Sequence, residues 1–154
     1  MKLLPVLFVC CLGLCTKGQG KLQYKVNPNP LIIIDTLTTT NETMIAHPSK
    51  FISITTINSV KAIQLYGDHG KFGAIQIQAQ PNIQWARLEA ILDKFNIESQ
   101  YRSLKVCINK FPVVEPQKIL ADLSEILTVE ITNSIPTKVP GEYYINIVTQ
   151  QGSR

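Results

Sequence analysis

The chain has 154 residues, of which 45% are hydrophobic and 17% are charged, and its formal net charge is +4. This length fits one domain or two very small ones. The 15 basic and 11 acidic residues are dispersed along the chain, and this small excess does not indicate nucleic-acid binding.

The first 20 residues have the pattern of an export signal. A lysine near the start precedes the apolar run Leu3–Leu14, which is too short to span a bilayer as a helix. Gly18 and Gly20 are small residues suited to signal peptidase, so we predict cleavage after Gly20, with lipidation at Cys15 as the alternative. The exported chain then begins at Lys21, with 13 basic and 11 acidic residues, and has no transmembrane helix.

Cysteine usage restricts the covalent chemistry of the exported chain. Three of the four cysteines lie in the predicted signal peptide, so only Cys107 remains and no intrachain disulfide forms. Because Cys107 lies in the apolar run Leu104–Ile108, a buried and inert thiol is favoured over a reactive one.

The first predicted strand is Leu31–Ile34, a continuous apolar run typical of a central strand buried on both faces. Residues 21–30 contain two prolines and are predicted to form an extended arm that leads into this strand. Weakly structured chain is expected over Thr36–Asn41, and a helical turn around Glu42–His47.

A glycine-spaced turn separates two further predicted strands. Val60–Tyr66 and Ala74–Ala79 both alternate with a period of two residues, which is typical of strands. We expect Asp68 to cap one helical turn between them, and Gly73 to end that turn in a left-handed conformation. The glycines of this structural turn, which permit unusual backbone angles, are Gly67, Gly70 and Gly73.

The clearest predicted helix is Pro81–Ile97, in which apolar residues recur at helical spacing. We expect this central helix to bury Leu88, Ile91, Leu92 and Phe95 against the sheets.

The pattern V-x-x-I-x-L-Y-G-x-x-G-x-x-G-x-I-x-I resembles the end of the plug domain of TonB-dependent receptors, in particular of short stand-alone relatives in secreted proteins of Bacteroidetes-type bacteria. Pro30–Asp35 (PLIIID) is similar to the strand that opens this unit, although Thr36 stands where relatives carry glycine. The resemblance covers Pro30–Gln80. It implies a short helix or turn at Phe51–Thr56, before a strand at Ile57–Val60.

The second half of the chain repeats the order of the first. Three stretches correspond in this interpretation: Lys105–Asn109 with Ile32–Asp35, Ile126–Thr132 with Val60–Tyr66, and Glu142–Thr149 with Phe72–Ala79. A helical or turn segment is expected at Gln117–Leu123, and Asn133–Gly141 replaces the glycine turn. We predict a divergent duplication, the alternative being a chance likeness of two β-rich halves.

The predicted fold class is α+β, with plug-like β-α-β units and small mixed sheets joined by the central helix. The expected divisions are a signal peptide at 1–20, a plug-like unit at 21–80, the central helix and linker at 81–103, and a second, divergent plug-like unit at 104–154. Whether the two halves share one sheet is left open.

The groups considered for catalysis are His47, His69, Asp35, Asp68, Cys107 and Tyr66. They fit no familiar metal or P-loop spacing, so no enzyme activity and no cofactor or metal is expected. After the plug-like motif too little chain remains for a transporter barrel. The prediction is therefore a binding module of the cell envelope, periplasmic or associated with the outer membrane, with an accessory role in nutrient uptake as a special case. The alternative is a small secreted hydrolase with an unrecognised site.

The predicted binding residues are Tyr66, Asp68, His69 and Lys71, which occupy the glycine turn together with an aromatic residue at its end. Loops held by a rigid scaffold are common recognition sites, and the expected partner is an envelope protein. Two alternatives remain open: a purely structural turn with solvated tips, and binding through an exposed edge strand. The sequence predicts neither the identity of the partner nor the oligomeric state.

Overall fold

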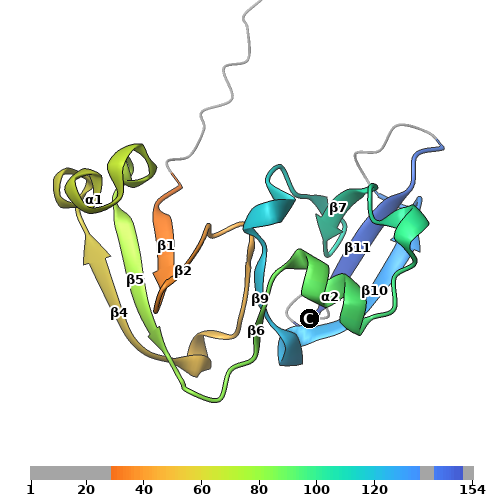
Figure 1. Cartoon of the computed structure of the whole chain (residues 1–154), viewed down its shortest axis with the longest axis horizontal. Coiled ribbons are helices and arrows are strands. Elements are labelled where there is room, and N and C mark those ends of the chain that lie inside the picture. The colour runs from red at the N-terminus through yellow and green to blue at the C-terminus, as the bar shows by residue number, and fades with distance from the viewer. Residues whose placement is uncertain (1–28, 136–140, 151–154) are drawn as a thin grey trace, which may run out of the picture.

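The structure is a computed structural model, which describes residues 29–135 and 141–150. The described residues form an α+β fold with two α-helices and three small mixed sheets (Figure 1). The predicted signal peptide, its cleavage and lipidation sites and most of the extended arm lie outside the described residues.

The first unit, residues 31–79, is built on a four-stranded sheet with the strand order β2-β1-β5-β4. Its two central strands, β1 and β5, pair in parallel, and each outer strand pairs antiparallel with its neighbour. The strands are β1 (Leu31–Ile34), β2 (Leu37–Thr39), β4 (Phe51–Ile57) and β5 (Ala74–Ala79). The predictions of β1 and β5 are confirmed, and β1 is central with its three isoleucines buried.

Two of the outer strands were not predicted. Strand β2 lies where weakly structured chain was expected, because Asp35, at φ 54°, turns the chain back within two residues and pairs Ile34 with Leu37. Strand β4 replaces the short helix or turn expected at Phe51–Thr56. Five of its seven residues are β-branched, which favours the extended conformation that pairs with β5.

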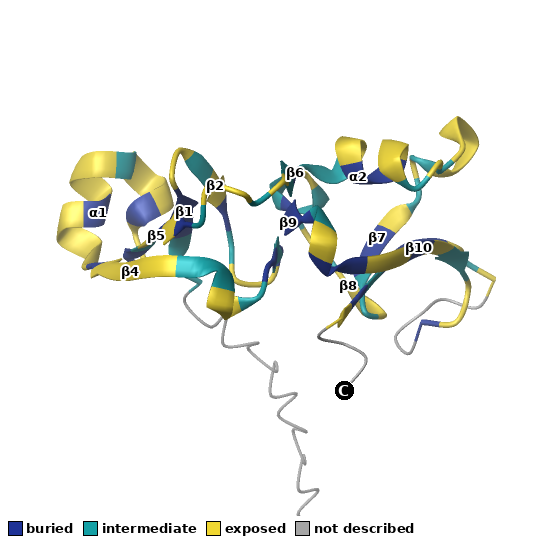
Figure 2. Ribbon diagram, turned by 90° about the horizontal axis from the view of Figure 1, so that it is seen from below, coloured by how far each residue is buried: buried dark blue, intermediate teal, exposed yellow. Residues whose placement is uncertain are grey.

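Helix α1 (Ser59–Tyr66) corrects the prediction of a strand at Val60–Tyr66 and of another at Ile57–Val60. The Asn58 side chain accepts a hydrogen bond from a backbone N–H of the first turn, and Gly67 caps the other end. The helix buries Ala62 completely against the sheet, while most of its surface stays exposed (Figure 2). Ala62 and Tyr66 are four residues apart, and both contact this small core.

The second unit, residues 105–149, has a four-stranded sheet with the order β8-β7-β11-β10. Its central strands, β7 and β11, pair in parallel and its outer strands pair antiparallel. The strands are β7 (Lys105–Ile108), β8 (Phe111–Pro112), β10 (Ile126–Thr132) and β11 (Tyr144–Thr149). The strands expected at Ile126–Thr132 and within Glu142–Thr149 are thus confirmed.

The two units share strand order and pairing sense, and each first hairpin turns at a residue with positive φ. Asp35 (φ 54°) and Asn109 (φ 51°) each donate their backbone N–H to the carbonyl of an isoleucine, Ile77 and Ile147 respectively. By strand order β10 corresponds to β4, so its predicted correspondence with Val60–Tyr66 was wrong. Divergent duplication as the origin of this likeness stays a prediction.

A third sheet lies between the two units and has the order β3-β9-β6 (Figure 1). Its strands are β3 (Met44–Ile45) from the first unit, β9 (Leu120–Asp122) from the second and β6 (Trp85–Ala86) from the connection. A helical turn was expected at Glu42–His47, but Met44 and Ile45 in that stretch form strand β3. The helical segment expected at Gln117–Leu123 is helical only at its two ends, because Leu120–Asp122 pairs as β9.

Helix α2 (Leu88–Lys94) is shorter than the helix predicted over Pro81–Ile97. It begins after β6 because Trp85 and Ala86 pair with β9, and it ends before Asn96, whose φ is 55°. The side chains predicted to face the core do so, Ile91 and Leu92 being fully buried and Leu88 and Phe95 partly buried. Short 3-10 turns complete the described elements: η1 (Pro48–Lys50), η2 (Gly67–Gly70), η3 (Ser99–Tyr101), η4 (Pro116–Lys118) and η5 (Leu123–Glu125).

Candidate functional site

The glycine turn connects α1 to β5 and is fixed by backbone contacts. Gly67 has φ 60° and Gly73 has φ 83°, so the left-handed conformation predicted for Gly73 is confirmed. Gly73 donates its N–H to the carbonyl of Gly70 over 2.8 Å and accepts from the N–H of Leu31 over 3.1 Å. The turn is therefore attached directly to the start of β1. Asp68 lies inside the 3-10 turn η2, which has no side-chain cap, so its predicted capping role was wrong.

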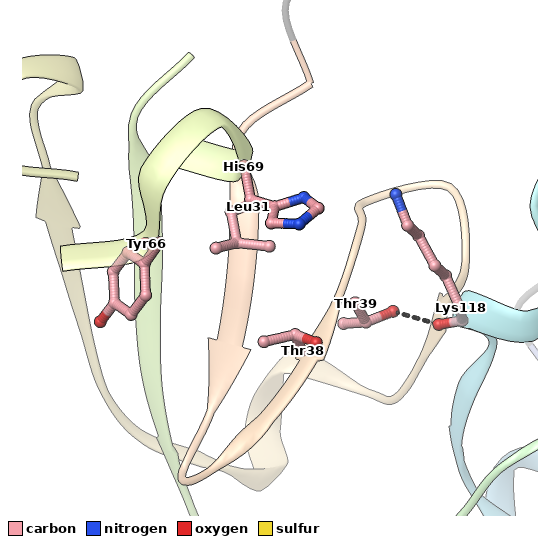
Figure 3. A pocket seen from close by; sticks show the side chains of 6 residues that line it. All are labelled: Leu31, Thr38, Thr39, Tyr66, His69 and Lys118. Carbon is pink, nitrogen blue, oxygen red and sulfur yellow. Dashed lines mark hydrogen bonds between the residues drawn. The ribbon is translucent and has the colours of Figure 1, made fainter. Parts of the chain in front are cut away.

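A groove with a volume of about 220 Å³ opens beside this turn (Figure 3). It is bounded by β1 and β2, by the end of α1 with the turn, and by η4 of the second unit. Its lining residues are Leu31, Thr38, Thr39, Tyr66, His69 and Lys118. Tyr66 and His69 were predicted as binding residues. The other four were missed because they come from strands and from the second unit, far from the turn in the sequence.

The polar groups of the groove fall into two sets. Thr39 donates its hydroxyl to the carbonyl of Lys118 over 2.9 Å, and the Lys118 ammonium lies 2.8 Å from a carboxylate oxygen of Glu115. The Thr39 hydrogen bond thus attaches β2 to η4, and Glu115 neutralises the charge of the Lys118 ammonium. By contrast, the side chains of Thr38 and His69 form no hydrogen bond within the described part of the chain, so their polar atoms are free for a ligand, whereas the Tyr66 hydroxyl points away from the other lining residues (Figure 3).

Arg87 connects the two walls of the groove. Its guanidinium donates to the carbonyl of Thr38 over 2.9 Å and to the carbonyls of Lys118 and Ile119 over 3.3 and 3.4 Å. Strand β2 and the segment that precedes β9 are thereby held by one side chain. A guanidinium suits this task because its donors form a planar fork.

The remaining predicted binding residues lie outside the groove. Asp68 and Lys71 are exposed and line no part of it, and the Lys71 ammonium lies 5.0 Å from the centre of the Phe72 ring. A second, polar hollow of about 370 Å³ lies on the first sheet. It is lined by Asp35, Ser53, Thr55, Gln76, Ile77 and Gln78.

The groups considered for catalysis are not gathered in one place. Cys107 is fully buried beside Ile135 and Tyr144, and this burial raises the pKa of its thiol, as expected for an inert cysteine. His47 lies at the start of η1, where its Nδ1 accepts the backbone N–H of Ser49. Within residues 29–135 and 141–150, no three His, Cys, Asp or Glu side chains are grouped to hold a metal ion.

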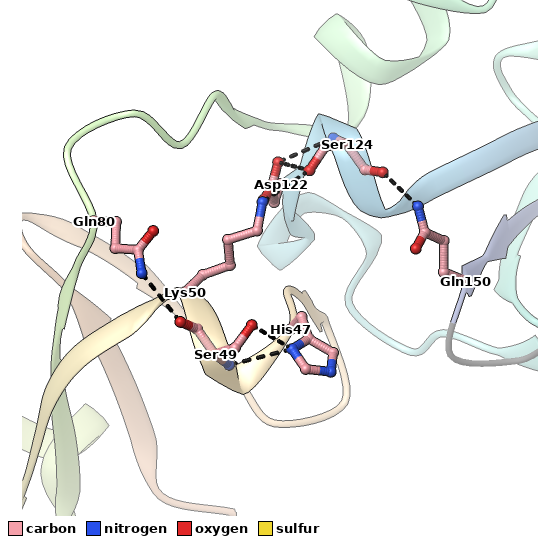
Figure 4. Close-up of polar contacts among 7 residues, drawn as sticks. All are labelled: His47, Ser49, Lys50, Gln80, Asp122, Ser124 and Gln150. Atoms are coloured by element: carbon pink, nitrogen blue, oxygen red, sulfur yellow. Dashed lines mark hydrogen bonds and ion pairs between the residues drawn. The ribbon is translucent and has the colours of Figure 1, made fainter.

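An ion pair joins the two units at the end of β9 away from Lys118 (Figure 4). The Lys50 ammonium lies 3.0 Å from a carboxylate oxygen of Asp122, whose side chain is only 3% exposed. Asp122 also accepts the N–H and the hydroxyl of Ser124, over 2.9 and 2.8 Å. Burial alone raises the pKa of Asp122, but the hydrogen bonds from Ser124 and Lys50 outweigh it and hold this pKa below its ordinary value of 3.8.

The Asp122 carboxylate therefore stabilises the fold in its charged form. The pKa of Asp122 is lower in the folded than in the unfolded chain. Its contribution to stability is therefore present above pH 3.8 and is lost as the pH falls from 3.8 through the lower pKa of the folded chain. Asp122→Asn should lower the free energy of unfolding at about pH 6, and should lower it less at a second pH that lies below the pKa of Asp122 in the folded chain. Urea unfolding at both pH values measures this. An equal loss at both would show that the charge of Asp122 is not what stabilises the fold.

No known family model matches the chain, and no curated protein or solved structure matches it either. No helix among the described residues is long and apolar enough to cross a membrane.

Proposed function

We propose that the protein is a non-enzymatic binding module of the cell envelope, which receives an apolar side chain of a partner protein in the groove beside the glycine turn. The observation that carries this proposal is the meeting of Tyr66 and His69 with residues of both units around one groove. Ligand sites are typically hollows with a mostly apolar lining and a few polar groups that fix orientation.

The lining favours a polypeptide over a small anion. Leu31 and the Tyr66 ring offer apolar contact, and the free Thr38 hydroxyl and His69 imidazole suit the N–H and C=O groups of a peptide backbone. Among the described residues that line the groove, one carries an ammonium, Lys118, and it is already paired with Glu115. An anionic ligand would have to displace that carboxylate.

The placement in the cell envelope rests on the sequence. The predicted export signal and the resemblance of Pro30–Gln80 to the plug domain of TonB-dependent receptors both favour an exported protein. An accessory role in nutrient uptake at the outer membrane follows from the same resemblance and is part of the proposal.

Filling the groove should abolish partner binding. Thr38 is exposed at its rim, so Thr38→Trp would place an indole inside it, while Lys71→Trp adds the same bulk outside the lining. In affinity capture from an envelope fraction, followed by titration of the protein recovered, we expect Thr38→Trp to weaken binding at least about tenfold, or 1.4 kcal/mol. Lys71→Trp should bind as the unchanged protein does.

Both variants must first show an unchanged melting temperature, so that a loss of binding reports on the groove. If Thr38→Trp captures its partner as well as Lys71→Trp does, the groove is not the binding site. If pure protein instead turns over an ester, peptide or phosphate substrate, and His69→Ala abolishes the turnover, the non-enzymatic proposal fails.

A further inference from the structure

Strand β4 forms one outer edge of the first sheet and carries exposed apolar side chains. Within residues 29–135 and 141–150, no strand pairs with its outer side. Ile52 is 58% exposed and Ile54 is 59% exposed. Unpaired N–H and C=O groups along such an edge can accept another strand. Natural proteins usually prevent this with charged residues, proline or irregular strand geometry.

The second unit shows how such an edge is protected in the same fold. In the first sheet, Thr55 on β4 pairs with Gln76, and in the second sheet Glu130 on β10 pairs with Asn146. Gln76 and Asn146 are themselves equivalent, since each pairs with the third residue of the central parallel strand. Thr55 thus stands where β10 has a glutamate.

The charge on β10 is fixed in place, whereas β4 has none. The Asn146 amide donates to a carboxylate oxygen of Glu130 over 2.8 Å, which holds a negative charge in the middle of the edge strand. Strand β4, with the sequence FISITTI, contains no charged residue and no proline. Its one irregularity lies between Phe51 and Ser53, so the stretch Ser53–Ile57 is regular.

We propose that β4 pairs antiparallel with β4 of a second copy of this chain, about a twofold axis at Thr55. A second copy is a suitable partner because β4 carries no charge, so two β4 strands can pair without repulsion between like charges. A twofold axis also repeats each contact between the two copies. Thr55 then faces Thr55 and Ile54 faces Thr56. Threonine pairs and pairs of β-branched residues are favourable across antiparallel strands.

The pairing joins two four-stranded sheets into one of eight strands. An axis perpendicular to the sheet places the two α1 helices at opposite ends of the joint sheet, because α1 follows directly after Ile57 at one end of β4. The groove of the proposed partner site lies on the β1 and β2 side of the sheet and stays open in the dimer. The inference is therefore independent of the proposed function.

Placing a glutamate on β4, at the position equivalent to Glu130 of β10, tests the proposal. Sedimentation velocity of the purified protein, from about 1 to 200 μM, should show a reversible dimer. Thr55→Glu sets two glutamates opposite each other and should raise the dissociation constant of the dimer at least about tenfold. The matched control, Thr128→Glu on the exposed edge of β10, should leave that constant unchanged.

A second variant and two outcomes make the test decisive. Ile54→Lys changes the neighbouring residue on the other face of β4 and should also weaken the dimer, with circular dichroism showing that both variants stay folded. A single-chain mass of the unchanged protein at every concentration overturns the proposal, and would leave the edge for an extended segment of another protein. A dimer that persists in both β4 variants overturns it as well.

Discussion

Gly70→Ala should destabilise the protein by about 3 kcal/mol or more, at the upper end of the range for overpacked sites. A Cβ atom at Gly70 would lie 2.3 Å from both the carbonyl carbon and the oxygen of Ala62, and 2.8 Å from the nitrogen of Ile63. These are backbone atoms of α1, so the clash is relieved only if the helix and the turn move apart, which disturbs the packing of α1 on the sheet. Ala62 is the side chain that the helix buries completely, and that contact would be lost.

Gly67→Ala is the matched control for this effect. Gly67 has φ 60°, but a Cβ atom there meets nothing within 4 Å. Only the backbone penalty applies, and because ψ is −144° this conformation is one that essentially only glycine adopts, so we expect a cost of about 1–3 kcal/mol. Urea unfolding of both variants, followed by circular dichroism, gives the two free energies. Equal losses would mean that the close approach of Gly70 to α1 does not limit the packing of the turn.

Leu92→Ala should cost about 2–5 kcal/mol, as is typical for truncation of a fully buried leucine. Leu92 is completely buried in the largest core, where α2 packs against the second sheet and the central sheet. The Ile91 side chain beside it is equally buried, so the space left behind has little freedom to collapse. Thermal unfolding of the purified variant measures the loss.

The control for Leu92→Ala is Glu89→Ala on the exposed side of the same helix. The Glu89 side chain is 74% exposed and lies 3.6 Å from Arg102, which keeps a closer contact of 2.6 Å with Asp93. We expect a change within about 0.5 kcal/mol, because exposed ion pairs contribute little. If Leu92→Ala were as mild as this control, α2 would not be part of the main core.

Strands with strong local patterns could be predicted from the sequence, and the helix α1 could not. Leu31–Ile34 and Ala74–Ala79 are apolar or alternating runs whose burial follows directly from their pattern. Val60–Tyr66 alternates too, but the same residues place Ala62 and Tyr66 on one helical face. The deciding signals were the caps, Asn58 before the helix and Gly67 after it, and these are local side-chain and backbone effects that the alternation obscured.

The central sheet and the groove depend on contacts between distant residues. Strands β3 and β6 have two residues each, too few for any periodicity to appear, and they exist because β9 pairs with both. Tyr66 and His69 could be selected from the sequence because the glycine turn displays them. Thr38 and Lys118 enter the groove only through the packing of β2 and η4 around Arg87.

The central sheet also sets the order in which the chain can complete its fold. During synthesis the first unit emerges with β3 at Met44–Ile45, but its partner strand β9 at Leu120–Asp122 appears only after helix α2 and strands β7 and β8. Until then Ile45 and its backbone groups lack their neighbours. A long-range pairing of this kind delays folding, because the closure of a large loop must precede any gain from the contact. The nascent first unit is therefore an incomplete structure, and an early stop in translation would leave an unpaired strand rather than a smaller stable domain.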